Sequence, residues 1–229
     1  MRSDAQGVLV IWNDIEEAWE AEFLNWHVRE HIPERVGLPG FLRGLRYVAI
    51  EGTPKYFNFY EATDDAVFSS AAYRERLDGP TPWTRRVVAH FANTTRTICR
   101  RIAHAGLGDG AFVETLRLSI AAGSEFATSV KDRLLPALVR TEGIAAASLL
   151  QAVPLASAGD SAEKKLRRQP DQIADWVLIT EAVMPASLMG AARVAALEAG
   201  LREAGAQPGW QRGVYQLQFA LSATNGRIS

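Results

Sequence analysis

The chain has 229 residues, which is enough for one large domain or for two of about 110 residues each. Hydrophobic residues make up 48% and charged residues 22%, a balance typical of a packed globular protein and unlike collagen-like or disordered chains. The 25 Lys and Arg residues against 26 Asp and Glu residues give a net charge of -1, so we expect no nucleic-acid partner and no binding to an anionic membrane.

Cysteine usage and apolar runs exclude further classes. The single cysteine, Cys99, cannot form an intrachain disulfide or a cysteine-based metal site. Residues 1–7 lead into a strand-like run without the apolar core of a signal peptide. The longest apolar stretches, such as residues 144–150, are far shorter than the roughly 20 residues of a membrane span. We therefore expect a cytoplasmic protein that does not cross a membrane.

The elements expected in chain order form the same series twice. In the first half, strands are predicted at residues 8–12, 41–50, 56–62 and 94–102, and helices at 16–32 and 66–77. The first helix should close at Pro33, because proline disrupts a continuing helix. In the second half, strands are predicted at 112–120, 144–153, 175–183 and 210–221, and helices at 125–140 and 187–204. Each half therefore reads strand, helix, strand, strand, helix, strand.

An internal repeat supports this division. A shift of 103 positions superposes five residues of one window on identical residues: Glu22, Phe23, Pro33, Val36 and Gly40 on Glu125, Phe126, Pro136, Val139 and Gly143. Residues 56–62 resemble residues 176–182 at a shift of 120, so the second copy contains an insertion before this strand. The polar stretch at about 156–174 is the candidate, and we expect it to be an exposed excursion. Residues 1–105 should form the first repeat and residues 106–229 the second.

The predicted fold class is α+β. A βαββαβ unit has two helices on one face of an antiparallel four-stranded sheet, and its other face needs cover. The runs at 8–12 and 177–179 lack polar alternation, which indicates burial on both faces. Two ferredoxin-like repeats with their sheets packed face to face would make an intrachain pseudo-dimeric barrel. The chain should then be a monomer containing that pseudo-dimer, or a homodimer.

The segment 26–35, with residues 38–41 and Arg46-Tyr47, resembles the dimeric α+β barrel superfamily and particularly its EthD-like members. Members of that superfamily are usually small homodimers, whereas this chain would be a fused tandem version. The resemblance implies a ligand pocket between sheet and helices. It also implies a choice among cofactor-free oxygenation, cyclisation, isomerisation, lyase chemistry and plain binding, without deciding between them.

Candidate catalytic residues are concentrated in the first repeat. At the same shifts, His27, His31, Arg46 and Tyr60 correspond to Val130, Leu134, Leu149 and Thr180. A purely structural role would favour the same residues in both copies, so the asymmetry indicates one site in the first half. His27 and His31 share a helix face, and histidine suits acid–base chemistry near neutral pH. Phe23 and Trp26 lie on the adjoining stripe, which equally suits core packing.

The segment 27–31 also matches the H-x-x-E-H pattern of inverted zinc peptidases. In those enzymes two imidazoles hold zinc and the glutamate activates water. No downstream glutamate stands out as a third ligand, so a zinc-dependent hydrolase is the weaker alternative and we expect no metal or organic cofactor.

Neighbouring strands and loops supply further candidates. Tyr56, Asn58 and Tyr60 alternate onto one strand face, where a phenol could hold a substrate oxygen. Arg46 could clamp a carboxylate or carbonyl, or belong to a surface ion pair. Trp83 could form an apolar wall in the basic connection 80–86, or lie in a plain connector.

These residues lead to one main hypothesis and one rival. The main hypothesis is a cofactor-free enzyme acting on a small apolar or aromatic oxygenated metabolite. His27 or His31 would move a proton, Tyr60 and Arg46 would stabilise oxygen charge, and Phe23, Trp26, Tyr56, Asn58 and Trp83 would bind the substrate. The rival is a non-catalytic protein that binds a small molecule in the same pocket.

Overall fold

The computed structural model describes residues 5–120, 123–153, 161–167 and 170–223. The first half contains the strands β1 (Gly7–Ile15), β2 (Phe41–Glu51), β3 (Tyr56–Ala62) and β4 (Phe91–Gly106). Between β1 and β2 lie a short 3-10 turn (Glu17–Trp19), α1 (Glu20–Trp26), a π-helical segment (His27–His31) and α2 (Ile32–Val36). Between β3 and β4 lie a 3-10 helix (Asp65–Ser69), α3 (Ala71–Asp78) and α4 (Pro82–Val88).

The second half follows the same plan. Its strands are β5 (Phe112–Leu118), β6 (Ile144–Ala152), β7 (Trp176–Ala182) and β8 (Gln211–Ser222). Between β5 and β6 lie α5 (Gly123–Ser129), a π-helical segment (Val130–Leu134) and α6 (Leu135–Val139). The short α8 (Ala162–Lys165) precedes β7, and α9 (Ala186–Met189) and α10 (Ala191–Ala204) precede β8.

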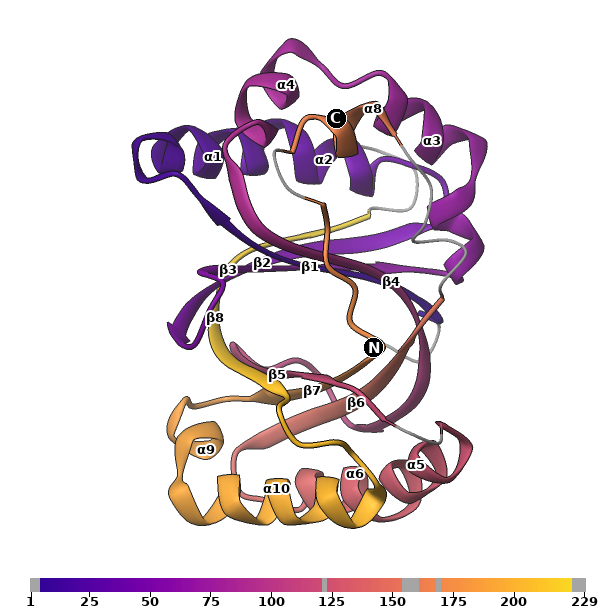
Figure 1. Ribbon diagram of the computed structural model, residues 1–229, viewed down its shortest axis with the longest axis vertical. Coiled ribbons are helices and arrows are strands. Elements are labelled where there is room, and N and C mark those ends of the chain that lie inside the picture. Colours follow the sequence, from indigo (N-terminus) through magenta and orange to yellow (C-terminus); the bar gives the residue numbers. More distant parts are fainter. Residues whose placement is uncertain (1–4, 121–122, 154–160, 168–169, 224–229) are drawn as a thin grey trace.

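All eight strands form one closed antiparallel barrel in the order β1–β3–β2–β8–β5–β7–β6–β4. Within it, the first half contributes the series β4–β1–β3–β2 and the second half the matching series β8–β5–β7–β6. The two series join where β2 pairs with β8 and where β4 pairs with β6. Apart from α8, the helices of each half cover the outer face of their own strands, so the barrel lies between two helical layers (Figure 1). The predicted α+β class and barrel are therefore observed, and edge pairing of the two strand series closes the barrel.

Strand burial explains why the apolar runs lack alternation. Every residue of β3 and of β7 is buried, because one face lines the barrel interior and the other lies under helices. Phe57 and Phe59 point into the barrel core, whereas Tyr60 packs with the first-half helices. As expected, Tyr56, Asn58 and Tyr60 lie on one face of β3, and Phe57 and Phe59 lie on the other.

The first helix continues past Pro33, contrary to the expectation that it ends there. The backbone widens into a π turn at His27–His31, and the Ile32 N–H donates to the His27 carbonyl five residues earlier. Proline lacks an N–H and its ring clashes with the carbonyl four residues before it, so the wider turn accommodates Pro33 within the helix. The second half repeats this arrangement, with the Leu135 N–H donating to the Val130 carbonyl just before Pro136.

Two connections also differ from expectation. The predicted helix 66–77 is a 3-10 helix followed by α3, separated at Ser70, whose hydroxyl caps α3 by accepting from the Tyr73 N–H. The segment 80–86 is not an irregular connector, because Thr81 caps α4 and Pro82 occupies its first turn. The strand predicted at 94–102 extends from Phe91 to Gly106, through the expected boundary between the halves.

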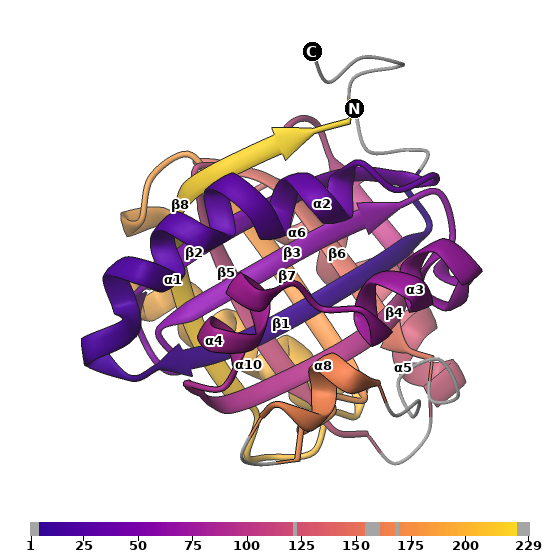
Figure 2. The ribbon, with the colours of Figure 1, turned by 90° about the horizontal axis from the view of Figure 1, so that it is seen from above.

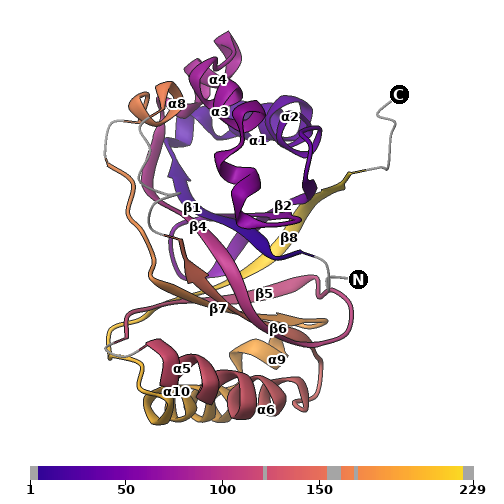
Figure 3. The same cartoon turned by 90° about the vertical axis from the view of Figure 1, so that its right-hand side faces the viewer.

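The polar insertion does not lie free in solvent where it is described. Residues 161–167, including α8, pack against α3 and α4 of the first half. Figure 2 shows α8 beside α4 in the helical layer of the first half, and Figure 3 shows the chain descending from there to β7 in the second half. Residues 154–160 and 168–169 of this insertion lie outside the described residues. Within the described part of the chain, no helix is long and apolar enough to cross a membrane.

Candidate active site

A small enclosed cavity lies between the first-half helices and the outer face of β1, β3 and β4. Its volume is about 20 Å³, which is room for about one water molecule. Five of the residues expected from the sequence line it: Trp26, His27, His31, Asn58 and Tyr60. Leu9, Ile11 and Val88 supply apolar wall.

His27 and His31 enter this cavity from the π-helical segment. Their side chains are 2% and 7% exposed, and their rings stack with centroids 5.3 Å apart. Phe23 stacks on His27 at 5.2 Å, and Trp26 lies 4.4 Å from His31. Burial lowers the pKa of both imidazoles well below 6.5, and the charge of Arg46 near His27 and of Arg35 near His31 acts in the same direction. Both rings are therefore neutral at pH 7.

Tyr60 faces His27 across the cavity. Its hydroxyl lies 3.4 Å from Nε2 of His27, a long contact in which the phenol can donate when the imidazole proton is on Nδ1. Burial raises the pKa of Tyr60, so the phenol keeps its proton. The Nδ1 atoms of His27 and His31 are buried and have no hydrogen-bond partner among the described residues. A neutral base and a protonated donor are thus in contact at one wall.

Asn58 closes the floor beside this pair. Its side chain is 2% exposed, and its Nδ2 donates to Oδ1 of Asn13 at 2.9 Å. The amide is therefore held in one orientation on β3.

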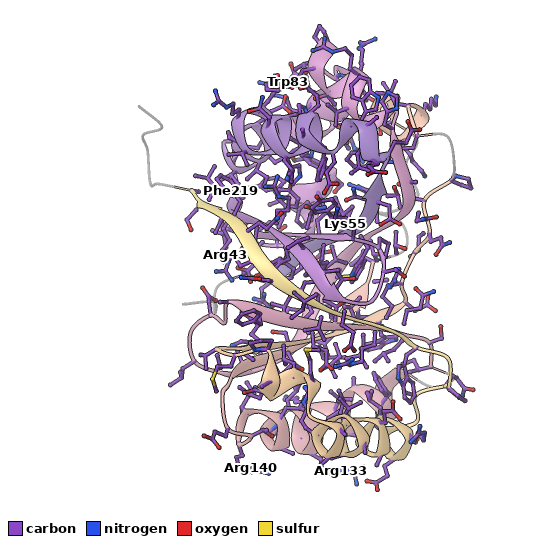
Figure 4. All side chains as sticks on the ribbon, turned by 90° about the vertical axis from the view of Figure 1, so that its left-hand side faces the viewer. Arg43, Lys55, Trp83, Arg133, Arg140 and Phe219 are labelled. Atoms are coloured by element: carbon purple, nitrogen blue, oxygen red, sulfur yellow. The ribbon has the colours of Figure 1, made fainter. Side chains whose placement is uncertain are left out.

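Four other residues predicted for the site do not line the cavity. Arg46 is anchored on β2 by donating to the Leu24 carbonyl at 3.2 Å and to Gln218 at 3.1 Å. Tyr56 donates to Glu20 at 2.5 Å, and Trp83 donates to Glu22 at 2.7 Å. Figure 4 shows Trp83 at the outer end of the helical layer, far from the barrel. Phe23 supports the cavity from behind by stacking on His27.

The H-x-x-E-H segment does not form a zinc-peptidase arrangement. Oε1 of Glu30 accepts from Trp26 at 3.2 Å, from Thr81 at 2.5 Å and from Thr84 at 3.2 Å, so this carboxylate ties α1 to the start of α4. In the described ranges, no three His, Cys, Asp or Glu side chains are grouped so that they could hold a metal ion. Cys99 is buried, and burial raises the pKa of its thiol, which leaves it unreactive.

Sequence reasoning missed five polar residues that line the cavity: Arg35, Tyr73, Arg96, Glu163 and Arg167. Arg35 could have been found, because it continues the four-residue spacing of His27 and His31 along one helix. Glu163 and Arg167 could not, because they reach the cavity from the insertion, more than a hundred residues away in the chain.

The corresponding region of the second half is filled with hydrocarbon. Val130, Leu134 and Leu138, at the positions equivalent to His27, His31 and Arg35, belong to a continuous apolar core with Phe126 and Leu178. The strand position equivalent to Tyr60 is the smaller Thr180. Thr180 of β7 pairs with Ala147 of β6, whereas Tyr60 of β3 pairs with Gly44 of β2. Among the described residues, these polar positions of the first half are therefore occupied by apolar or smaller side chains in the second half.

Comparison with solved structures identifies the fold. An anthrone oxidase-like protein superposes with a TM-score of 0.66 at 11% identity, covering 96% of this chain and 94% of its own. A candidate monooxygenase from Fusobacterium nucleatum subsp. nucleatum gives 0.60 at 11% identity, with 95% of each chain covered. Another candidate monooxygenase, from Lactobacillus acidophilus, gives 0.57 at 9% identity and covers 95% of this chain and 97% of its own.

These likenesses extend over whole chains. The chain therefore has the dimeric α+β barrel fold expected from the sequence, here closed by eight strands of one polypeptide. No protein-family model matches the sequence, and no curated protein matches it.

Proposed function

We propose that the protein is a cofactor-free enzyme of oxygenase type that acts on a small aromatic or otherwise apolar molecule bearing oxygen. The observation that carries the proposal is the pair His27 and Tyr60, a neutral buried base beside a protonated phenol, at a cavity that would have to widen from about 20 Å³ to admit an aromatic ring. The fold shared with an anthrone oxidase-like protein and with candidate monooxygenases supports oxygenation over the cyclase, isomerase and lyase chemistry of EthD-like proteins.

His27 would act as the general base. Its Nε2 would take a proton from an activated methylene carbon of the substrate, and the electron pair left on carbon would delocalise onto a neighbouring ring oxygen. The Tyr60 hydroxyl would then donate a hydrogen bond to that oxygen and stabilise its charge. Burial and the charge of Arg46 disfavour the imidazolium formed at His27, so the oxyanion formed beside it would have to stabilise it as a counter-ion.

The substrate would supply the electrons for oxygen. The carbanion reduces O₂, one oxygen atom becomes the carbonyl oxygen of the product, and the other leaves as water with the two methylene hydrogens. The methylene carbon is oxidised and dioxygen is reduced, so atoms and electrons balance without a further reductant.

The second half would serve as scaffold in place of a partner subunit. Both halves have the same strand order, and their π-helical segments recur at the shift of 103 residues seen in the sequence. This agreement supports duplication of one ferredoxin-like unit, followed by retention of polar side chains in the first copy only.

The test is oxygen uptake with anthrone as the probe substrate. We expect uptake by the wild-type protein with conversion of the methylene to a carbonyl, and a loss of about 100-fold or more in kcat/KM for His27→Gln. Tyr60→Phe should lose about 10-fold or more, whereas Thr180→Val, its counterpart in the second half, should retain full activity.

Two outcomes would contradict the proposal. Equal activity of the wild-type protein and His27→Gln would remove the base from its role. Binding of aromatic probes in this cavity without any turnover would favour the rival function, a small-molecule binding protein.

A further inference from the structure

Three arginines line the same cavity as Tyr60 and His27. Arg35 comes from α2, Arg96 from β4 and Arg167 from the segment that follows α8. Arg35 is 3% exposed, and its guanidinium lies 5.5 Å from the centre of the Tyr73 ring. Arg96 donates to the Tyr73 hydroxyl at 2.9 Å. A buried cluster of this kind is costly unless anionic groups face it.

One carboxylate of the inserted segment supplies part of that charge. Nη2 of Arg35 donates to Oε2 of Glu163 at 2.5 Å, and Glu163 is itself 7% exposed. Glu163 is on α8, which reaches the first half only through the insertion. The second half cannot form the counterpart of the Arg35–Glu163 pair, because its position corresponding to Arg35 is Leu138.

Arg96 is the least matched of the three arginines. Arg167 pairs with Asp171 at 2.8 Å, and Arg35 pairs with Glu163 and, at 3.7 Å, with Glu34. Arg96 has no carboxylate within ion-pair distance among the described residues, and Nη1 of Arg35 is buried without a hydrogen-bond partner. Both histidines are neutral, so Arg96 offers a charge with no direct carboxylate partner among the described residues, and Nη1 of Arg35 offers an unused hydrogen-bond donor.

We propose that the arginines Arg35 and Arg96 form a carboxylate-binding subsite, and that Glu163 occupies this subsite until a substrate carboxylate displaces it. The inference deepens the proposed function and rests on it for the identity of the reacting site, since it assigns the substrate an acidic group. A carboxylate is the ligand that the structure itself places on Arg35, and a guanidinium binds that group with two parallel donors.

The helix geometry orients such a substrate. Arg35 follows His27 by eight residues on the same helix, which separates their backbones by roughly 12 Å. The carboxylate would therefore lie at one end of the ligand and the reacting carbon at the other, beside His27 and Tyr60. Withdrawal of Glu163 would also free the volume of its own side chain, which a cavity of about 20 Å³ lacks.

Binding of matched probes tests the subsite without turnover. Naphthoate and naphthamide have nearly the same shape and differ in charge, and titration calorimetry at low salt gives the affinity of each. We expect the wild-type protein to bind naphthoate about 10-fold or more tightly than naphthamide. Glu163→Gln should strengthen naphthoate binding by about 10-fold, because the competing charge is gone, and should leave naphthamide binding nearly unchanged.

A control variant on the same helix is Lys165→Gln, since Lys165 is exposed. It changes the charge of α8 outside the cavity and should alter neither affinity. Arg96→Met should abolish the preference for naphthoate, and retained naphthamide binding would show that this variant folds.

Three results would overturn the inference. These are equal affinities of the two probes for the wild-type protein, an equal effect of Glu163→Gln on both, and a lowered melting temperature of Glu163→Gln with unchanged affinities. The last would mean that Glu163 only fastens α8 to the first half. If the naphthoate preference holds but neither anthrone nor a carboxylated anthrone takes up oxygen, the subsite stands and the oxygenase proposal fails. If oxygen uptake depends on His27 but no naphthoate preference exists, the oxygenase proposal stands and the subsite fails.

Discussion

At the residue scale, the site depends on two imidazoles that the fold keeps neutral. His27 and His31 are surrounded by aromatic rings and each other, and the charged groups nearest them are arginines rather than carboxylates. An imidazolium in this position would be both desolvated and repelled. Neutrality therefore follows from packing, and it leaves His27 unprotonated at physiological pH, as the proposed proton transfer requires.

This neutrality predicts a pH dependence of stability. Below pH 6.5 the unfolded chain takes up protons at His27 and His31 that the folded protein does not, because both folded pKa values are lowered. The free energy of unfolding should therefore fall with decreasing pH below 6.5, by up to about 1.4 kcal/mol per pH unit for each histidine.

Urea unfolding between pH 7 and pH 5 measures this slope. The double variant His27→Gln/His31→Gln should show a shallower slope over the same range. An identical slope in the variant would mean that the imidazoles are protonated in the folded protein.

Gly44 provides a second prediction at this scale. A Cβ at Gly44 would lie 2.9 Å from Cδ1 and Cε1 of Tyr60 and 3.0 Å from Ile32, so glycine makes room for the phenol. Gly44→Ala should destabilise the protein by about 1–3 kcal/mol and reduce oxygen uptake by moving Tyr60. In the second half Ala147 already occupies the matching position, opposite Thr180. Ala147→Gly should cost about 1 kcal/mol and leave uptake unchanged, as measured by urea unfolding and an oxygen electrode.

At the scale of elements, hydrogen bonds between α1 and α4 hold together the helices that cover the cavity. Oε1 of Glu30 receives bonds from Trp26 on α1 and from Thr81 and Thr84 at the start of α4. Thr81 also caps α4 by accepting from the Thr84 N–H at 3.0 Å. One threonine therefore both begins a helix and links it to the helix that carries His27.

Comparison of two helix caps separates these roles. Ser70 caps α3 by accepting from the Tyr73 N–H at 3.2 Å, and Ser70→Ala should cost about 1 kcal/mol. Thr81→Ala should cost about 2 kcal/mol, since it also removes a hydrogen bond to the Glu30 carboxylate. Denaturant unfolding of both variants gives the difference, and equal costs would mean that the link to Glu30 contributes nothing.

At the scale of the whole molecule, closure of the barrel removes free strand edges. β2 pairs with β8 and β4 pairs with β6, so each sheet edge left open by one half is covered by the other. We expect a monomer in solution, with the mass of one chain by light scattering from micromolar to higher protein concentrations. A stable dimer would show that the surface outside the barrel carries an interface.

The sequence predicted the series of strands and helices along the chain better than their bounds. The apolar runs without alternation indicated strands buried on both faces, as observed in β3 and β7, because this pattern reflects burial. The helix through Pro33 was mispredicted because only a wider turn in three dimensions accommodates that proline.

Sequence periodicity identifies only those cavity residues that lie close together in the chain. His27, His31 and Tyr60 were found because they lie on one helix face and one strand face. Glu163 meets Arg35 across 128 residues, and no periodicity records such a contact.

The most direct measurement is a crystal structure of the protein soaked with naphthoate. The account predicts the aromatic rings beside His27 and Tyr60 and the carboxylate on Arg35, with Glu163 displaced from that guanidinium. Naphthoate bound in the second half, or on the outer surface with the Arg35–Glu163 pair intact, would contradict it.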